Sequence, residues 1–129
     1  MISQNRKKLG DLGENLAQSF LLSKGYMILD KNFRCRFENI YGEIDIIAKD
    51  QNFICFVEVK TRFGNIHSNP SESVTQKKQR KISNVAQLYL LKKKLTRFNA
   101  RFDVVELIFN IETSGYSIRL IKDAFYCNL

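Results

Sequence analysis

The chain has 129 residues, of which 44% are hydrophobic and 26% charged, a composition typical of one globular domain and unlike that of a disordered tail. Lys and Arg outnumber Asp and Glu by 21 to 13, and the resulting charge of +8 favours a polyanionic partner such as nucleic acid or an anionic membrane face. No apolar run is long enough for a transmembrane helix, and the N-terminal segment shows no apolar core of a secretory signal.

Histidine and cysteine are too scarce for several kinds of site. His67 is the single histidine, which excludes multi-histidine zinc sites, and we assign no role to it. The cysteines Cys35, Cys55 and Cys127 form no Cys-x-x-Cys pair and are odd in number, so we expect reduced thiols in a cytoplasmic protein. Gly-rich nucleotide-binding loops are also missing. Catalysis by this chain would therefore rely on carboxylates and lysines, with a metal ion that prefers oxygen ligands.

The hydrophobic pattern predicts, in chain order, a helix, three strands, a helix and two strands. The predicted helices cover residues 5–24 and 74–93, and the predicted strands cover residues 26–33, 42–49, 53–61, 101–109 and 116–121. Gly25 is the expected C-cap of the first helix, and residues 63–73, which include the only proline, are expected to form a loop. This order predicts a single α/β domain over residues 1–129, with a mixed central sheet and helices on both faces.

Four ionisable residues on the second and third predicted strands form the most informative cluster. Glu43 and Asp45 are two residues apart, as are Glu58 and Lys60, so each pair shares a face of its strand. The hairpin brings Asp45 and Glu58 within reach of one metal ion, for which Mg²⁺ or Mn²⁺ is suited. Lys60 would orient the attacking water or offset charge on a phosphate. The alternative is a structural cross-strand salt bridge between Lys60 and one carboxylate.

The spacing of these residues resembles the PD-(D/E)xK signature of nucleases. Asp45 is followed after twelve residues by Glu58 and Lys60, and Ile44 stands where the signature has proline. The chain from about residue 5 to 107 also resembles the bacterial YraN family, UPF0102, which is similar to archaeal Holliday-junction resolvases. The segments that carry this resemblance are GENLAQSFLLSKGYMILDKNFR, YGEIDIIAKD, FVEVKTR, VTQKKQRKI and RFDVVE.

The resemblance implies a restriction-endonuclease-like fold with an αβββαβ core. It implies metal ligation by Asp45, Glu58 and the Val59 carbonyl, and a catalytic role for Lys60. The expected activity is metal-dependent hydrolysis of DNA phosphodiester bonds, with branched DNA among the expected substrates. Action on both strands of a branched substrate would suit a homodimer.

Two helical residues are further candidates for the site. Glu14 lies at the edge of the apolar stripe of the first helix, where it is either a water-mediated metal ligand, as the resemblance implies, or a solvated glutamate paired with a lysine. Lys78 lies in the middle of the apolar stripe of the second helix, so its ammonium must snorkel to water or reach an anion. We favour contact with the scissile phosphate or with an acidic residue of the site.

Basic residues dominate the second half of the chain, and no acidic residue occurs between Ser73 and Phe102. This density predicts phosphate contacts, and we expect DNA rather than a membrane as the partner. The basic residues of this window are Lys77, Lys78, Arg80, Lys81, Lys92, Lys93, Lys94, Arg97 and Arg101, to which Arg62 is added from the third strand.

Two other functions fit the same residues. A nucleic-acid-binding module with a vestigial nuclease site would need no metal ion and would tolerate the loss of Lys60. An interaction scaffold would use the basic face to bind an acidic protein more tightly than DNA at the same salt concentration.

Overall fold

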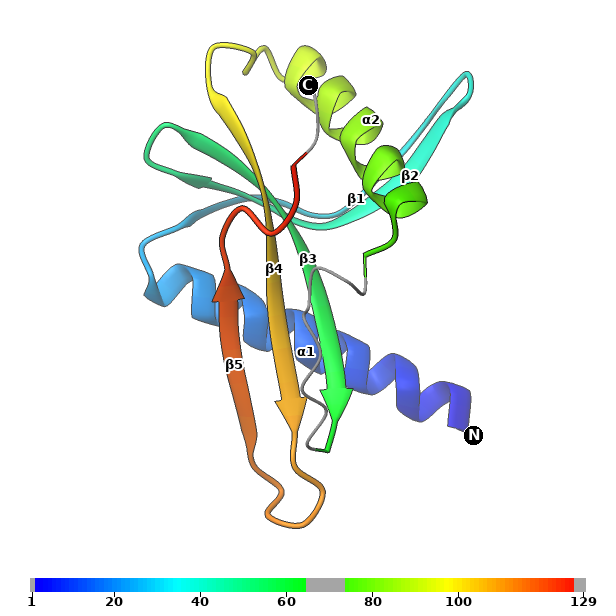
Figure 1. Cartoon of the computed structure of the whole chain (residues 1–129), viewed down its shortest axis with the longest axis vertical. Helices are drawn as coiled ribbons and strands as arrows, with labels where there is room; N and C mark the ends of the chain where they lie inside the picture. The colour runs from blue at the N-terminus through cyan, green and yellow to red at the C-terminus, as the bar shows by residue number, and fades with distance from the viewer. Residues whose placement is uncertain (1, 65–73, 127–129) are drawn as a thin grey trace.

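The computed structural model of the chain describes residues 2–64 and 74–126, with side chains from residue 7 onwards. Its two helices and five strands follow the predicted order (Figure 1). The elements are α1 (Ile2–Ser23), β1 (Met27–Phe37), β2 (Ile40–Asp50), β3 (Phe53–Phe63), α2 (Gln76–Lys92), β4 (Asn99–Phe109) and β5 (Tyr116–Ile121). Most of the predicted loop, with His67 and Pro70, lies outside the described residues, as does Cys127.

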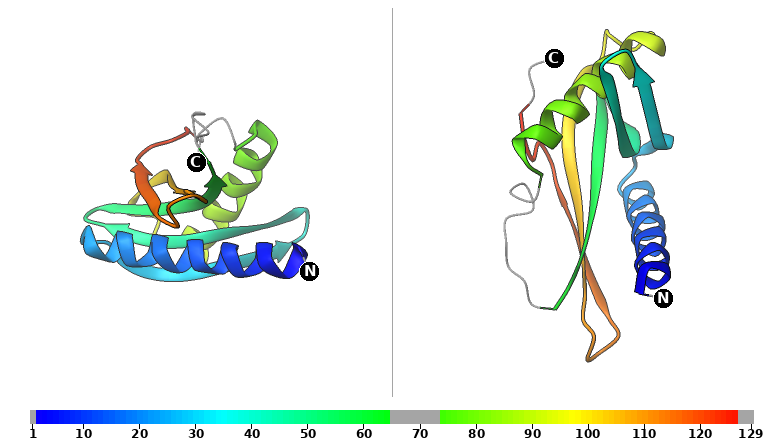
Figure 2. Two further views of the ribbon diagram at one scale, coloured as in Figure 1. Left: turned by 90° about the horizontal axis from the view of Figure 1, so that it is seen from below. Right: turned by 90° about the vertical axis from the view of Figure 1, so that its right-hand side faces the viewer.

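The five strands form one mixed sheet in the order β1-β2-β3-β4-β5. Neighbouring strands are antiparallel except for β3 and β4, which run parallel and are connected through α2. Helix α1 covers one face of the sheet and α2 covers part of the other face (Figure 2). The predicted α/β class is confirmed, and a mixed sheet between two helices is consistent with a restriction-endonuclease-like fold.

Two apolar cores, one on each face, hold the helices against the sheet. Ala17 and Leu21 of α1 are fully buried against Cys55 and Val57 of β3 and their neighbours. On the other face, α2 buries the largest side chains of its apolar stripe against the sheet, among them Tyr89. Burial of a large apolar side chain stabilises the fold by about 1.5–3 kcal/mol, so these cores fix both helices. Among the described helices, none combines the length and the apolar character needed to cross a membrane.

Local signals set the ends of both helices. Gly25 adopts a positive φ of 89° and the Tyr26 N–H donates to the Leu21 carbonyl, which ends α1 near the predicted cap. Helix α2 begins slightly later than predicted, because Thr75 is its N-cap and accepts a hydrogen bond from the Lys78 N–H at 3.2 Å. This cap fixes the first turn of α2 beside the first half of β2.

The hairpin of β1 and β2 is longer than the sequence predicted. The first strand was expected to end at Phe33, but it continues to Phe37 and pairs with β2 as far as Ile40. The prediction failed because only one face of this segment is apolar, and Cys35 on that face packs on the α2 side of the sheet. We call residues 34–43 the hairpin arm; it projects beyond the sheet beside α2 (Figure 1).

The hairpin arm separates from β3 at a definite point. Pairing between β2 and β3 runs from Asp50–Phe53 to Ile46–Val57 and then stops, whereas β3 stays paired with β4 along its whole length. The next residues on the two strands are Asp45 and Glu58. The separation therefore opens the sheet at the two carboxylates that the sequence singled out.

Candidate active site

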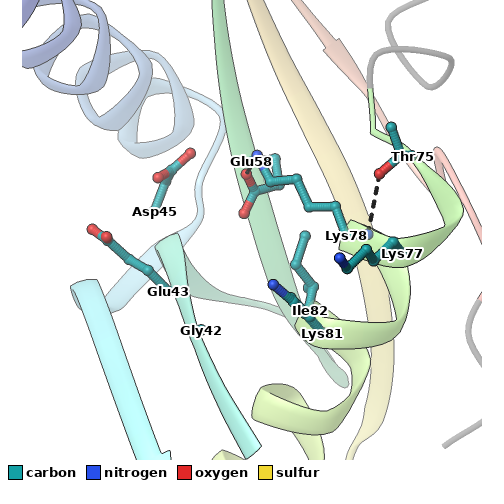
Figure 3. Close-up of a pocket in the computed structure, with 9 residues that line it drawn as sticks. All are labelled: Gly42, Glu43, Asp45, Glu58, Thr75, Lys77, Lys78, Lys81 and Ile82. Atoms are coloured by element: carbon teal, nitrogen blue, oxygen red, sulfur yellow. Dashed lines mark hydrogen bonds and ion pairs between the residues drawn. The ribbon is translucent and has the colours of Figure 1, made fainter.

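A cavity of about 490 Å³ lies where β2, β3 and the first turns of α2 meet (Figure 3). Carboxylates come from the strands and amino groups from the helix. The charged residues that line it are Glu43, Asp45, Glu58, Lys77, Lys78 and Lys81. The sequence predicted a meeting of Asp45, Glu58 and Lys78, and the structure brings these three residues together.

Asp45 is fixed by the backbone of β3. Its Oδ2 atom accepts a hydrogen bond from the Val59 N–H at 2.8 Å. This hydrogen bond takes the place of the backbone pairing between β2 and β3, which ends at Ile46 and Val57. Burial raises the pKa of Asp45, and Glu43 adds to this rise, although the Val59 N–H and the ammonium group of Lys78 oppose it. The Asp45 carboxylate is thus held beside Glu58 in surroundings that favour a nearby positive charge.

Glu58 is the least satisfied acid of the site. Its side chain is 3% exposed, and its Oε2 atom lies 3.2 Å from Lys78 Nζ. Its Oε1 atom is buried without a hydrogen-bond partner among the described residues. Burial raises the pKa of Glu58 to about 7, and the charge of Asp45 is the second cause. A buried carboxylate oxygen with no donor is costly, and a cation or a water molecule would relieve that cost.

The backbone carbonyl of Val59 faces the same space. In an extended strand the N–H and C=O of one residue point to the same edge, and the Val59 N–H is bonded to Asp45 at the β2 edge. The Val59 carbonyl therefore lies at that edge and outside the pairing with β4. This position agrees with the predicted ligand set of Asp45, Glu58 and Val59.

Lys60 and Lys78 provide positive charge beside the two acids. Lys60 is half-buried on the same face as Glu58, and its pKa is lowered by burial first and by the charge of Lys78 second. Burial also disfavours the charged form of Lys78, but Glu58 outweighs it and the pKa of Lys78 is raised. The ion pair of Glu58 is made with Lys78 on α2, whereas the structural alternative predicted from sequence placed a bridge at Lys60.

Glu14 of α1 approaches the site from the other face. It is half-buried, and its pKa is raised by burial first and by the charge of Asp45 second, with a hydrogen bond to Asn32 acting in the opposite direction. The neighbouring Gly13 permits this approach, because a Cβ atom there would lie 2.5 Å from Thr61 Oγ1. The hydrogen-bond partner of Glu14 is thus an asparagine, whereas the solvated alternative predicted a lysine.

The basic residues predicted to bind nucleic acid fall into separate groups. Lys77, Lys78 and Lys81 line the cavity and Arg80 is exposed beside them, whereas Lys92, Lys93 and Lys94 are exposed at the opposite end of α2. Two residues are internal instead. Arg62 is 17% exposed, and its Nε atom lies 3.4 Å from Glu106 Oε2. Arg101 is buried, so the assignment of Arg101 to the basic surface was wrong.

The residues present fit a hard divalent cation. Within the described residues, no group of three or more His, Cys, Asp or Glu side chains is gathered to hold a metal ion. Two carboxylates and a carbonyl suffice for Mg²⁺, which usually takes one or two protein carboxylates and completes its shell with water and substrate phosphates. The observation that favours such an ion is the Glu58 Oε1 atom, which has no hydrogen-bond partner within residues 2–64 and 74–126.

Comparison with known proteins gives one consistent result. The model of the uncharacterised protein family UPF0102 matches residues 13–107. A UPF0102 protein of Clostridium tetani is 57% identical over 119 residues, which cover 92% of this chain and 94% of the relative. UPF0102 proteins of Clostridium kluyveri and Clostridium botulinum are 52% identical with the same coverage. The matched region includes both strands of the site.

Proposed function

The chain belongs to the protein family UPF0102, and we propose that it is a divalent-metal-dependent endonuclease that hydrolyses phosphodiester bonds in DNA. The observation that carries the proposal is the state of Glu58. Its carboxylate is buried beside Asp45, with one oxygen 3.2 Å from Lys78 Nζ and the other without a hydrogen-bond partner among the described residues. An acid in this state suits a metal ligand better than a structural ion pair.

Each residue of the site then has a separate task. Asp45, Glu58 and the Val59 carbonyl would hold Mg²⁺ or Mn²⁺, and the hydrogen bond from the Val59 N–H keeps Asp45 in position. A bound ion of this kind lowers the pKa of a water ligand and offsets charge on the phosphate. Lys60, on the face of Glu58, would orient the attacking water or stabilise the negative charge that develops on the phosphate oxygens.

Lys78 and its neighbours would hold the substrate backbone. Lys77, Lys78 and Lys81 line the side of the cavity formed by α2, opposite Glu43 and Asp45 (Figure 3). Positive charge on this side neutralises phosphates and offsets their repulsion from the carboxylates. Such contacts carry no sequence information, so binding should depend strongly on salt and weakly on sequence.

The decisive experiment is cleavage of a panel of branched, single-stranded and duplex DNAs with Mg²⁺ or Mn²⁺. We expect the wild type to cleave at least one of them and Asp45→Asn to be inactive while still folded. Glu112→Gln, at an exposed position in the turn after β4, is the matched control and should cleave like the wild type. No cleavage of any substrate with either metal would overturn the proposal.

Metal binding can be tested without cleavage. An ion that binds only the folded protein raises its melting temperature, so Mn²⁺ should stabilise the wild type and have little effect on Asp45→Asn. Equal shifts for both proteins would place the ion elsewhere and count against the proposed ligands.

One observation favours a second candidate function. The ion pair between Lys78 and Glu58 already neutralises part of the acidic charge without a metal ion, as in a nucleic-acid-binding module with a vestigial site. That module would bind DNA equally well in EDTA and would not respond to Asp45→Asn. The two functions therefore differ in the metal dependence of DNA binding.

A further inference from the structure

The hairpin arm carries one face that leads directly into the candidate site. A Cβ atom at Gly42 would lie 3.1 Å from Val85 Cγ2 of α2, and Ile44 is fully buried in the core on the α2 side. Because side chains alternate along a strand, Tyr41 and Glu43 share the opposite face of the hairpin arm. Tyr41 thus lies on the same face as Glu43, which lines the cavity.

Tyr41 is an exposed aromatic residue among positive charges. It is 55% exposed, and Lys81 Nζ lies 4.4 Å from the centroid of its ring. Its cross-strand neighbour on the same face of the hairpin arm is the exposed Arg36. The pKa of the Tyr41 hydroxyl is lowered, by Lys81 first and to a lesser extent by Lys77 and Arg36.

This combination is suited to a nucleic-acid base beside a phosphate. Exposed aromatic side chains accept the flat face of any base, and nearby cations hold the backbone that carries it. A second aromatic residue, Phe37, is 57% exposed at the end of β1, next to Arg36. A single exposed aromatic residue would need no explanation, but this one lies near three cations and shares a face with Glu43 of the cavity.

The spacing along β2 relates the ring to the scissile phosphate. Tyr41 and Asp45 are four residues apart on β2, which corresponds to about 13 Å along a strand. A DNA strand with a phosphate at Asp45 and Glu58 would therefore present a nearby base at Tyr41. Bases in a duplex are paired and stacked on one another, so only an unpaired base can lie on the ring.

We propose that Tyr41 stacks on an unpaired base, and that the hairpin arm thereby selects DNA with unpaired nucleotides beside the cleaved bond. This inference rests on the proposed function and specifies its substrate class. Single strands and the junctions of single strands with duplex fit the site, whereas a fully paired blunt duplex does not use Tyr41.

Binding without cleavage tests the stacking. Single-stranded oligonucleotides with 2-aminopurine at each position in turn, blunt duplexes and duplexes with a single-stranded flap are titrated with the protein in Ca²⁺ and again in EDTA. Stacking on an aromatic ring should change the 2-aminopurine fluorescence at one or two positions. Tyr41→Leu should abolish that change and weaken binding to single strands and flaps by roughly 5- to 100-fold, with blunt duplex affected less than about twofold.

Two further variants make the experiment decisive. Tyr41→Phe keeps the ring and should bind like the wild type. Tyr116→Leu is the matched control, because Tyr116 is 51% exposed but lies on β5, far from the hairpin arm, and should change nothing (Figure 1). Melting temperatures near that of the wild type would show that the variants are folded.

The outcomes separate this inference from the proposed function. Equal affinities of Tyr41→Leu and Tyr116→Leu for single strands would overturn the stacking, even if the protein cleaves DNA. An equal loss on blunt duplex and single strand would also overturn it, because the residue would then only support the hairpin arm. If the wild type cleaves nothing but the fluorescence change depends on Tyr41, the nuclease proposal fails and the stacking stands.

Discussion

Two groups of buried acids lie on opposite faces of the same sheet, and they are satisfied very differently. On the α1 face, Asp103 is fully buried, and Arg101 Nε and the Asp123 N–H both donate to its Oδ1 atom at 2.9 Å. Arg101 Nη2 also donates to Asp103 Oδ2, to Tyr26 Oη and to Asp50 Oδ2 at 3.0, 2.6 and 3.2 Å. We call Tyr26, Asp50, Arg101 and Asp103 the arginine cluster.

The candidate site on the α2 face lacks a comparable set of hydrogen-bond donors. Glu58 Oε2 has Lys78, but Oε1 has no hydrogen-bond partner among the described residues, and burial and Asp45 raise the pKa of Glu58 to about 7. Burial of an acid therefore does not by itself indicate function. An acid whose acceptors are not matched by donors indicates a place where another molecule or ion completes the structure.

Glu106 is an intermediate case that supports this distinction. It is 1% exposed, and its Oε2 atom has no hydrogen-bond partner in the described part of the chain, but Arg62 Nε lies 3.4 Å from that atom and Arg119 Nε donates to Oε1 at 3.0 Å. Two guanidinium groups thus face one carboxylate. We interpret Glu106 as a structural acid, because its charge is already more than neutralised.

The arginine cluster should give the largest effect on stability. Arg101→Met leaves the Asp103 carboxylate buried with most of its donors removed, which should lower the free energy of unfolding by about 3–5 kcal/mol in urea denaturation. Lys122→Met is the control, because Lys122 is 57% exposed and lies 3.8 Å from Asp50 Oδ2, so it should cost less than about 1 kcal/mol. Equal effects of the two changes would contradict the comparison.

Lys60→Ala should show the opposite pattern, with a large effect on catalysis and a small one on folding. Lys60 is half-buried beside Lys78, which repels its charge, and Glu58, which attracts it. Loss of one preorganised charge should raise the barrier by about 2–4 kcal/mol in single-turnover cleavage while DNA binding is kept. A folded variant with wild-type rates would remove Lys60 from the catalytic machinery.

Glu58 should make the metal-free protein less stable as pH rises. Its pKa is about 7 in the folded state against 4.5 for an ordinary glutamate, so the folded protein holds this proton more tightly than the unfolded chain. Stability should therefore fall between about pH 4.5 and pH 7, by roughly 2–3 kcal/mol, in urea denaturation with EDTA. Glu58→Gln should flatten this decline, and an unchanged decline would assign it to other groups.

The sequence predicted the candidate site but not the arginine cluster. The strands, the helices and the meeting of Asp45, Glu58 and Lys78 followed from periodicity, spacing and the position of Lys78 in an apolar stripe. The arginine cluster was missed because Arg101 stands in a basic stretch, and only the fold reveals that its side chain is buried beside Asp103.

The same limit applies to the hairpin arm. Arg34 and Arg36 alternate with Cys35 in a segment that is apolar on one face only. The local hydrophobic pattern therefore did not predict that the strand continues to Phe37. That Glu58 Oε1 has no partner among the residues that the structure describes also could not be predicted, because hydrogen-bond satisfaction depends on contacts between distant segments.

The smallest effects are expected from pairs of lysines at the two ends of α2, and they extend the comparison to DNA binding. Lys77 and Lys81 line the cavity, whereas Lys92 and Lys93 lie about 23 Å along the helix from Lys77. From sequence, both pairs were expected to contact phosphates. Because the proposed scissile phosphate lies at the first end, Lys77→Gln with Lys81→Gln should reduce the slope of log affinity against log salt by about two. Lys92→Gln with Lys93→Gln removes the same charge and should change the slope by less than about one; an equal change would extend the DNA along the whole helix.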